Sequence, residues 1–328
     1  MSIWDSERSP TDELATEIDR PSIAETKDDM HSTGESAGML TTGQIERWLR
    51  EDVGHHDVSN QLPGSTTGRL VAKEPGVVAG LDATERVFEY VGGSVTDALE
   101  EGSRVEPGDN LLVVSGPTRE LLRGERLAVN LAGHASGIAT KTHRAVEAAA
   151  SVSEGAVDGD DVESSMGSPP RIAATRKTTP GLRGLEKRAV AAGGGDTHRL
   201  DLSHMVMVKD NHVAEFGLEG AIEHLAAQAS FATKIEVEVE RADEVVRAAE
   251  AGADAILLDN MRPDEVRDAV ETLADAGHGD VLTEASGGIG LDEVRGYAET
   301  GVDVISMGAL THSAPSLDLS FRTEGDAE

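Results

Sequence analysis

The chain has 328 residues and a formal net charge of −32, from 61 acidic and 29 basic residues. Nucleic acid and anionic membrane surfaces both attract cationic protein surface, so this charge argues against either one as a partner. The chain has no cysteine, no signal-peptide core and no long apolar run, which predicts a cytoplasmic protein without disulfides or membrane spans.

Residues 1–38 are rich in Asp, Glu, Ser and Thr and show no sustained period, which predicts a disordered acidic leader. Over the whole chain acidic residues outnumber basic ones, and aromatic residues make up only 2%. Such a surface keeps a protein hydrated at high salt, and we interpret the source as halophilic. An ordinary acidic protein is the simpler alternative.

Residues 39–143 are predicted to form an N-terminal α+β sandwich domain. Gln44 to Asp52 reads as a short helix, and Gly68 to Ala79 and Val105 to Val114 read as strands between Gly and Pro turns. Turns this close together indicate short antiparallel strands.

A long helix is predicted from Arg119 to Ala150, with a break near Gly137. Apolar residues at helical spacing form one stripe: Leu127, Leu131, Ala135 and Ile138. A polar stripe lies beside it: Arg126, Asn130 and His134. For such a stripe a solvated face is the default interpretation.

Residues 144–309 are predicted to form a second domain, in which an acidic insertion at 151–168 precedes a regular alternation of strands and helices. The predicted strands are 171–175, 205–209, 234–240, 255–259, 281–285 and 304–307. The predicted helices are 182–192, 218–228, 242–251, 263–276 and 291–300. This alternation requires a parallel sheet with right-handed crossovers. Six strands suit an incomplete α/β barrel of six to seven strands or an open doubly wound sheet. The missing G-x-G-x-x-G pattern disfavours dinucleotide binding.

Charged residues stand where four of these strands end. Arg176 and Lys177 follow the first strand, Lys209 ends the second, Glu238 lies near the end of the third and Asp259 ends the fourth. Barrels place their active sites at the carboxyl ends of their strands, so these side chains are predicted to share one site.

Two glycine turns follow the last two strands: Ser286-Gly287-Gly288 and Met307-Gly308-Ala309. Glycine lets a phosphate approach backbone N–H groups, and barrel phosphate sites commonly follow the last two strands. We therefore predict a phosphate site, with ordinary strand-to-helix turns as the alternative.

The strand Ile235 to Glu240 carries three glutamates on one face. In a sheet covered on both sides such carboxylates need cations or a metal. Glu238 and Asp259 could hold ribose hydroxyls or Mg²⁺. Glu236 and Glu240 need only pair with Arg or Lys.

Five cations form the predicted anion-binding set: Arg176, Lys177, His198, Arg199 and Lys209. Pairing with surface carboxylates is the alternative for all of them. We keep that alternative for Arg183, Lys187 and Arg188 on the following helix. His212 reads as a core or capping histidine, and His55 and His56 as loop residues.

Taken together, these segments resemble the quinolinate phosphoribosyltransferases. The resemblance runs in order over roughly residues 40 to 320, which makes it more specific than any single motif. It rests on Gly124 to Asn130, Ser136 to Thr140, Thr175 to Arg183, Gly193 to Gly195, His198-Arg199, Lys209 to His212, Glu236 to Glu238, Leu258 to Asn260, Glu284 to Ile289 and Ser306 to Thr311. The family pattern near the N-terminus is altered here to Glu51-Asp52-Val53-Gly54-His55-His56-Asp57.

The resemblance implies transfer of phosphoribose from 5-phosphoribosyl-1-diphosphate to quinolinate, with decarboxylation to nicotinate mononucleotide and a need for Mg²⁺. It also implies a homodimer, possibly a hexamer, in which residues 310–328 pack back on the N-terminal domain before becoming disordered.

The resemblance implies a role for each matching residue. Arg126 would reach the partner's site, while Thr175, Arg176, His198 and Arg199 would hold the dicarboxylate. Lys177 and Lys209 would lie near the reacting groups. Glu238 and Asp259 would serve the ribose and the Mg²⁺-diphosphate. The 5′-phosphate would bind at Ser286, Gly287, Gly288, Met307, Gly308 and Ala309.

The sequence leaves three alternative functions open. A related transferase could use another pyridine or a molybdenum-linked substrate, but the set Arg126, Arg176, His198 and Arg199 favours a dicarboxylate. A barrel lyase could form a Schiff base on Lys177 or Lys209, although nothing in the sequence shows the depressed pKa this needs. A non-catalytic binding protein is disfavoured by charged residues at so many strand ends.

Overall fold

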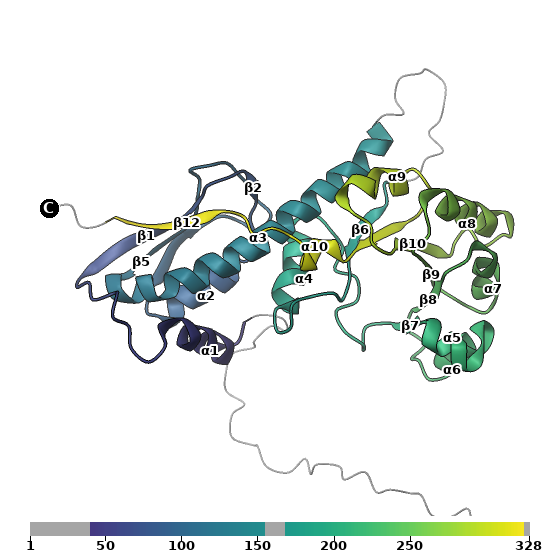
Figure 1. Ribbon diagram of the computed structural model, residues 1–328, viewed down its shortest axis with the longest axis horizontal. Helices are drawn as coiled ribbons and strands as arrows, with labels where there is room; N and C mark the ends of the chain where they lie inside the picture. Colours follow the sequence, from purple (N-terminus) through teal and green to yellow (C-terminus); the bar gives the residue numbers. More distant parts are fainter. Residues whose placement is uncertain (1–39, 155–167, 325–328) are drawn as a thin grey trace, which may run out of the picture. The chain divides into compact units, whose positions relative to one another are not determined.

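The computed structural model describes residues 40–154 and 168–324. The predicted leader (1–38) and residues 155–167 of the predicted insertion lie outside the described residues. Within the described ranges, no helix is both long and apolar enough to cross a bilayer. Figure 1 shows the order of the elements along the chain.

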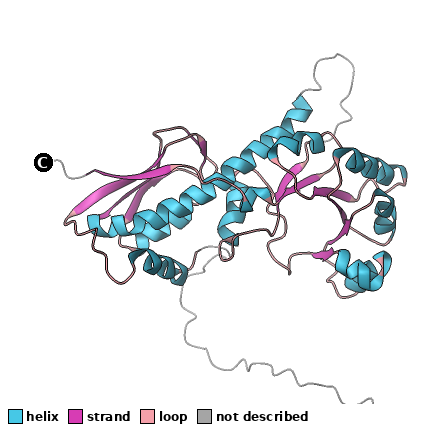
Figure 2. Ribbon diagram, viewed as in Figure 1, coloured by secondary structure: helices cyan, strands magenta, loops and turns pink. Residues whose placement is uncertain are grey.

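The N-terminal region is built on a four-stranded antiparallel sheet in the order β12-β1-β5-β3 (Figure 2). Its strands are β1 (Ser65–Ala72), β3 (Ser94–Ala98), β5 (Asn110–Pro117) and β12 (Leu319–Glu324). A two-stranded ladder joins β2 (Gly76–Val77) to β4 (Arg104–Val105). The predicted strand 68–79 is thus two strands, because Pro75 cannot donate to a ladder. The helices α1 (Thr42–Val53) and α2 (Leu81–Tyr90) complete this region.

The last strand of the described chain, β12, pairs with the first strand, β1. Its register sets Leu70 opposite Phe321. The Phe321 ring stacks on Phe88 of α2, with ring centroids 5.2 Å apart. The last strand therefore supplies part of the apolar core of the N-terminal region.

Helix α3 (Thr118–Glu154) is continuous, so the predicted break near Gly137 is wrong. It also extends through residues 151–154, which were assigned to the acidic insertion. Gly137 serves close packing instead: a Cβ there would lie well inside 3.0 Å of the Pro315 carbonyl oxygen. The backbone of the segment leading to β12 therefore runs directly against α3.

Gly137→Ala is expected to lower the free energy of unfolding by about 1–3 kcal/mol, because the Pro315 backbone has to move to admit the methyl group. Gly43→Ala on α1 is the matched control, since a Cβ at Gly43 meets nothing within 4 Å. That control should keep stability or raise it by up to about 1 kcal/mol. Urea unfolding measures both, and a Gly137→Ala midpoint at or above that of the unaltered chain would contradict the packing argument.

The second region is a six-stranded parallel sheet in the order β6-β11-β10-β9-β8-β7. The strands are β6 (Arg171–Ala174), β7 (Val206–Val208), β8 (Ile235–Val239), β9 (Ala255–Asp259), β10 (Leu282–Ser286) and β11 (Val304–Met307). Each strand from β7 to β11 therefore lies beside the next one in the chain, and β11 lies beside β6. This is the strand order of an α/β barrel that is open between β6 and β7. A doubly wound sheet would reverse direction midway. The predicted incomplete α/β barrel is therefore confirmed, and the open doubly wound alternative is excluded.

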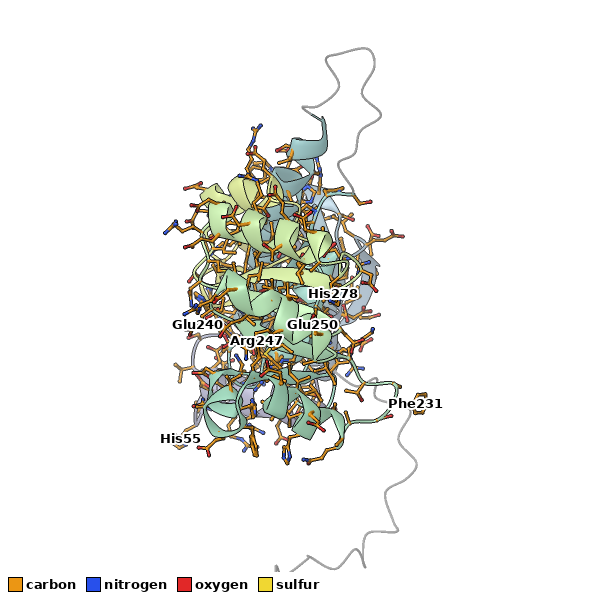
Figure 3. All side chains as sticks on the ribbon, turned by 90° about the vertical axis from the view of Figure 1, so that its right-hand side faces the viewer. His55, Phe231, Glu240, Arg247, Glu250 and His278 are labelled. Carbon is orange, nitrogen blue, oxygen red and sulfur yellow. The ribbon has the colours of Figure 1, made fainter. Side chains whose placement is uncertain are left out.

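Helices connect successive strands of the barrel and lie in series along the sheet (Figure 1). They are α4 (Arg183–Ala192), α5 (Asp210–Phe216), α6 (Leu218–Ala226), α7 (Val245–Glu250), α8 (Pro263–Asp275), α9 (Val294–Ala298) and α10 (Ala309–His312). On α7 the buried residues Val245 and Ala248 alternate with exposed Arg247 and Glu250, whose side chains point outward in Figure 3. This 3.6-residue period is what turns each helix toward the sheet.

The unpredicted helix α2 shows why some elements escape sequence patterns. Its first residue follows Gly80, which has a left-handed backbone and no capping side chain. The Glu101 carboxylate, twenty residues away, accepts the N–H groups of Gly80 (2.8 Å) and Leu81 (2.7 Å). A start signal supplied by a distant residue leaves no local trace.

Candidate active site

A cavity of about 340 Å³ opens at the carboxyl ends of the barrel strands. It is lined by Thr175, Arg176, Lys177, His198, Arg199, Met207, Lys209, Glu238, Leu257, Asp259, Glu284, Ser286 and Ser306. The strand ends thus bring together residues from six different strands or the segments that follow them, as expected where parallel strands meet at one edge.

A larger cavity of about 680 Å³ opens at the opposite mouth of the barrel. Two ion pairs lie at that mouth: Arg171 is 3.6 Å from Asp196, and Lys234 is 2.6 Å from Asp254. The smaller cavity lies at the carboxyl ends of the strands, where α/β barrels place their active sites, and is therefore the candidate site.

One wall of the candidate site is cationic. The Nε atom of Arg176 and the Oγ atom of Ser306 are buried and have no hydrogen-bond partner among the described residues. Arg199 is 9% exposed, and burial together with the Arg176 charge lowers its pKa. Lys177 is exposed at the rim, and its N–H donates to Thr175 Oγ1 (3.1 Å). Crowded cations with free donors suit an anionic ligand.

The opposite wall is acidic. The Lys209 ammonium donates to Glu238 and forms an ion pair with it. Asp259 stands on the next strand and accepts a hydrogen bond from Asn260 Nδ2 (2.6 Å). Burial and the Glu238 charge raise the pKa of Asp259. A carboxylate that is disfavoured in this way is stabilised by an added cation, so the Glu238–Asp259 pair fits Mg²⁺.

The predicted phosphate turns lie around the rim and not all within the cavity. Ser286 lines the cavity, and Gly287 and Gly288 follow it with φ values of 107° and 65°. A Cβ on Gly287 would collide with Asn260. Gly308 lies against Lys177, because a Cβ there would be 2.9 Å from Lys177 Cδ. Gly287 thus permits a close approach to the Asn260 backbone that a residue with a Cβ would not allow.

The two residues flanking Gly308 lie apart from the cavity. Met307 is fully buried beneath it, and Ala309 begins α10. Neither lines the cavity, so their predicted roles in binding stay predictions.

Arg126 is another predicted residue that does not line this cavity. It is exposed on α3 and lines a separate cavity of about 460 Å³ with Trp48, Asp52 and Asn130. The solvated-face interpretation holds for Arg126 and Asn130 in the single chain. It fails for His134, whose Nε2 lies 2.9 Å from the buried Glu186.

The sequence patterns miss two residues that support the site from α4. Lys187, assigned to surface pairing, is 2% exposed and donates to the carbonyls of Ala174 (3.5 Å) and Thr197. Burial, reinforced by nearby Arg183, lowers its pKa to about 8. Glu186 is fully buried and accepts the Thr179 N–H at 3.1 Å. Glu186 and Lys187 are adjacent residues of opposite charge on a helix, a pattern that does not predict burial.

The assignments of three other basic side chains have different outcomes. Arg188 lies 3.9 Å from Asp82, as the surface-pairing interpretation requires. Arg183 instead donates to Thr178 Oγ1 (3.0 Å) and to the Leu200 carbonyl (3.3 Å). His212 is a capping histidine, since its Nδ1 accepts the Lys209 N–H at the start of α5.

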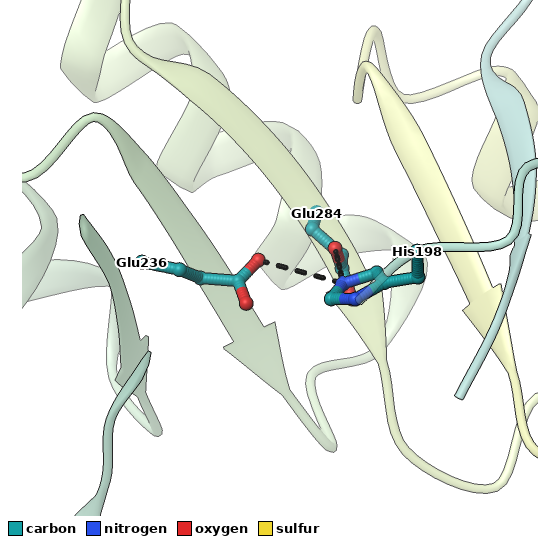
Figure 4. A group of neighbouring side chains, drawn as sticks. All are labelled: His198, Glu236 and Glu284. Carbon is teal, nitrogen blue, oxygen red and sulfur yellow. Dashed lines mark hydrogen bonds and ion pairs between the residues drawn. The ribbon is translucent and has the colours of Figure 1, made fainter. Parts of the chain in front are cut away.

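His198, Glu236 and Glu284 form a largely buried cluster (Figure 4). His198 and Glu284 line both cavities, whereas Glu236 lines only the larger one. His198 Nε2 lies 2.9 Å from Glu284 and 3.8 Å from Glu236. Glu236 was expected to pair with Arg or Lys, but it forms no ion pair with either within the described ranges. Burial, and then the Glu284 charge, raises the pKa of Glu236 to about 9. An inward charged residue at mid-strand, as in Thr283-Glu284-Ala285, is the signal that could have identified Glu284.

The raised pKa of Glu236 predicts a pH-dependent stability. Between its ordinary pKa of 4.5 and about 9 the folded chain holds a proton that the unfolded chain releases. Stability therefore falls as pH rises through this window, by up to about 1.4 kcal/mol per pH unit. Glu236→Gln should flatten the urea-unfolding midpoint across this window, whereas Glu240→Gln, at the exposed end of the strand, should follow the unaltered chain. Identical pH profiles for all three would contradict a protonated Glu236.

Comparisons with known proteins agree with this arrangement. The family model of the quinolinate phosphoribosyl transferase C-terminal domain matches residues 138–322, and that of the N-terminal domain matches residues 59–136. The chain is 43% identical over 287 residues to the probable nicotinate-nucleotide pyrophosphorylase (carboxylating) of Methanothermobacter thermautotrophicus, covering 86% of this chain and 98% of that protein. It is 42% identical over 281 residues to the nicotinate-nucleotide pyrophosphorylase (carboxylating) of Homo sapiens, covering 85% and 90%.

Solved structures show the same fold. The structure of NadC from Streptococcus pyogenes matches with a TM-score of 0.74 at 38% identity, over 87% of this chain and 97% of that chain. The nicotinate-nucleotide pyrophosphorylase from Francisella tularensis matches with a TM-score of 0.75 at 29% identity, over 86% and 95%. Since both domain models match in order and span the described site, the chain belongs to the quinolinate phosphoribosyltransferase family.

Proposed function

We propose that this chain transfers phosphoribose from 5-phosphoribosyl-1-diphosphate to quinolinate and releases diphosphate and CO₂, giving nicotinate mononucleotide for NAD biosynthesis. The observation that supports this most directly is the single cavity in which cations on one wall face carboxylates on the other. The two substrates both carry several negative charges, and both have to bind in that cavity. Family membership supports the same reaction.

The cationic wall is suited to quinolinate. Arg176 is partly buried with an unpaired buried Nε, Arg199 is buried with its Nη2 on the weak acceptor Met207 Sδ, and each guanidinium matches the fork of a carboxylate. Thr175 and His198 belong to the same wall, Lys177 stands at its rim, and Lys209 is paired with Glu238 on the opposite wall. A monocarboxylate would leave one of these cations unpaired at a cost in binding, which favours a dicarboxylate.

The acidic wall is suited to the sugar. Glu238 and Asp259 can accept hydrogen bonds from ribose hydroxyls and stabilise the positive charge that develops on the ribose as diphosphate leaves. The same two residues would hold Mg²⁺, which when bound offsets charge on the diphosphate. The turns Ser286–Gly288 and Met307–Ala309 are assigned to the 5′-phosphate.

Positioning supplies most of the catalysis in this proposal. The ring nitrogen of quinolinate forms a bond to ribose C1 as the bond from C1 to diphosphate breaks. The electrons of the bond to the neighbouring carboxylate then stay on the ring carbon, where the positive charge of the adjacent pyridinium nitrogen stabilises them. CO₂ leaves, and a proton replaces it on the ring carbon. Lys177 and Lys209 lie close enough to the cavity to stabilise the departing anions.

The exposed Arg126 supports a homodimer, which can assemble further into a hexamer. In the single chain Arg126 lines a cavity apart from the candidate site. In the proposed dimer it reaches the partner's site and adds a further cation for quinolinate.

The proposed function is tested by incubating the full chain with quinolinate, 5-phosphoribosyl-1-diphosphate and Mg²⁺ at high KCl, and assaying nicotinate mononucleotide and CO₂ by chromatography and isotope release. The expected result is product that requires all three additions. Comparable turnover of nicotinate would overturn the dicarboxylate assignment. CO₂ release at the normal rate without 5-phosphoribosyl-1-diphosphate would overturn the order of steps.

A further inference from the structure

The turn that carries His198 and Arg199 into the cavity is held from several sides. His198 has a left-handed backbone (φ 51°), which residues other than glycine adopt only at a cost. Its N–H donates to Asp196 Oδ1 at 2.7 Å, and Asp196 itself bridges to β6. The Lys187 ammonium donates to the carbonyl of Thr197. These contacts determine the course of the backbone at His198.

Both ring nitrogens of His198 are already bonded within the protein. The Arg199 N–H lies 2.7 Å from Nδ1, and because an amide nitrogen only donates, Nδ1 accepts. The ring proton is therefore on Nε2, which donates to Glu284 Oε2 at 2.9 Å (Figure 4). The side chains of His198 and Glu284 are 12% and 3% exposed, so water competes little for this bond. His198 has no free ring nitrogen for a substrate carboxylate.

The guanidinium of Arg199, in contrast to the His198 ring, has no strong acceptor within the protein. Its Nη2 donates to Met207 Sδ at 3.0 Å, a weak acceptor. Among the residues that the structure describes, its guanidinium forms no ion pair within 4.0 Å. A buried cation without a carboxylate partner is costly until an anion arrives. The group that stands ready for a carboxylate is Arg199, and His198 lies behind it.

We infer that His198 and Glu284 are positioning residues: Glu284 holds the His198 ring, and the Nδ1 of that ring holds the backbone of Arg199, whose guanidinium binds one carboxylate of the substrate. The identity of that substrate, a pyridine dicarboxylate, rests on the proposed function. The positioning chain itself rests on the hydrogen bonds of the ligand-free protein.

The same cluster also has the spacing of a metal site. One ligand atom each from His198, Glu236 and Glu284 lies within 4.8 Å of the others, and Glu236 Oε2 is buried without a partner. A metal would require a lone pair on the His198 ring. Nδ1 uses its lone pair on the Arg199 N–H and Nε2 carries the proton, so none is left. The geometry therefore favours hydrogen-bonded positioning over metal binding.

Two substitutions of His198 separate positioning from direct contact. His198→Asn keeps an acceptor near the place of Nδ1 and tolerates the left-handed backbone. His198→Gln puts its polar atoms near the place of Nε2. We expect His198→Gln to raise the KM for quinolinate by about 10- to 100-fold and His198→Asn to be at least about tenfold less damaging. The KM for 5-phosphoribosyl-1-diphosphate should stay within about twofold in both. The reverse order of damage would overturn the inference.

Two substitutions of Glu284 test whether its hydrogen bond or its charge matters. Glu284→Gln keeps an acceptor oxygen for Nε2–H, whereas Glu284→Ala removes it. We expect Glu284→Ala to raise the KM for quinolinate by about tenfold or more and Glu284→Gln to restore most of that loss. Gln as damaging as Ala would show that the charge is what matters and would overturn the inference.

A spectroscopic measurement keeps the inference testable if a variant fails to fold or the unaltered chain makes no product. Long-range proton–nitrogen correlation NMR of the full ligand-free chain reports which ring nitrogen of His198 is protonated, with His198→Asn used to assign the signal. The expected result is a proton on Nε2 that persists when Zn²⁺ is added. A proton on Nδ1, or loss of the Nε2 proton on adding Zn²⁺, would overturn the inference. Absence of nicotinate mononucleotide would instead remove the proposed function and leave this measurement intact.

Discussion

Lys177→Ala is expected to lower turnover of quinolinate by about 10²- to 10³-fold while the fold is retained. Lys177 lies at the rim between β6 and the Gly308 turn, where its ammonium can reach both predicted anion sites. The Thr311 hydroxyl donates to its carbonyl at 2.7 Å, which holds the backbone independently of the side chain. The substitution should therefore remove charge stabilisation and leave the loop in place. Steady-state kinetics and urea unfolding measure the two effects.

Lys234→Ala is the matched control for Lys177→Ala. It removes the same charge from the opposite mouth of the barrel, where Lys234 is exposed and paired with Asp254. A surface pair of this kind contributes little, so activity should stay within about twofold of the unaltered chain. Near-normal turnover in Lys177→Ala, or an equal loss in both variants, would remove Lys177 from the catalytic set.

Arg126→Ala is expected to lower kcat/KM for quinolinate by at least about 30-fold, the equivalent of about 2 kcal/mol, because a substrate carboxylate would lose its cationic partner. The decisive measurement is complementation. Co-expression of Arg126→Ala with Lys177→Ala should restore about a quarter of the normal activity, since half of the dimers would contain one intact site of two.

Arg144→Ala serves as the control for the Arg126 experiment, because Arg144 is also exposed on α3 but lies near Pro315, away from the candidate site. It should keep normal activity. Full loss in Arg126→Ala without recovery on co-expression would place Arg126 in its own subunit's site. A monomer in solution would equally contradict the proposed exchange.

The barrel was the most predictable part of the fold. Its strands are short apolar runs, such as Ala255–Asp259, that are buried on both faces and separated by helices of clear period. The predicted strands survive in the structure with shifts of one residue at the ends, whereas α7 and α9 begin three residues later than predicted and α5 was not predicted. Helix α2 and the unbroken α3 were less predictable, because the carboxylate of Glu101 and the carbonyl of Pro315 come from elsewhere in the chain.

The candidate site was predictable in its composition but not in its inner contacts. Arg176, Lys209, Glu238 and Asp259 all end strands, and parallel strands necessarily bring their ends to one edge. Nothing in the local pattern predicts that Lys187 turns inward, because its neighbours on α4 include exposed and buried residues alike.

The order of strands and helices and the charged residues at the mouth of the barrel could therefore be predicted from periodicity along the chain. Which of these residues meet depends on how the chain packs in three dimensions. The bond from His198 to Glu284 joins residues 86 positions apart, and it exists because the open barrel places the segment between α4 and β7 over the middle of β10. Burial there removes water as a competing partner, so the contacts that hold Arg199 in place depend on the folded barrel and not on any local segment.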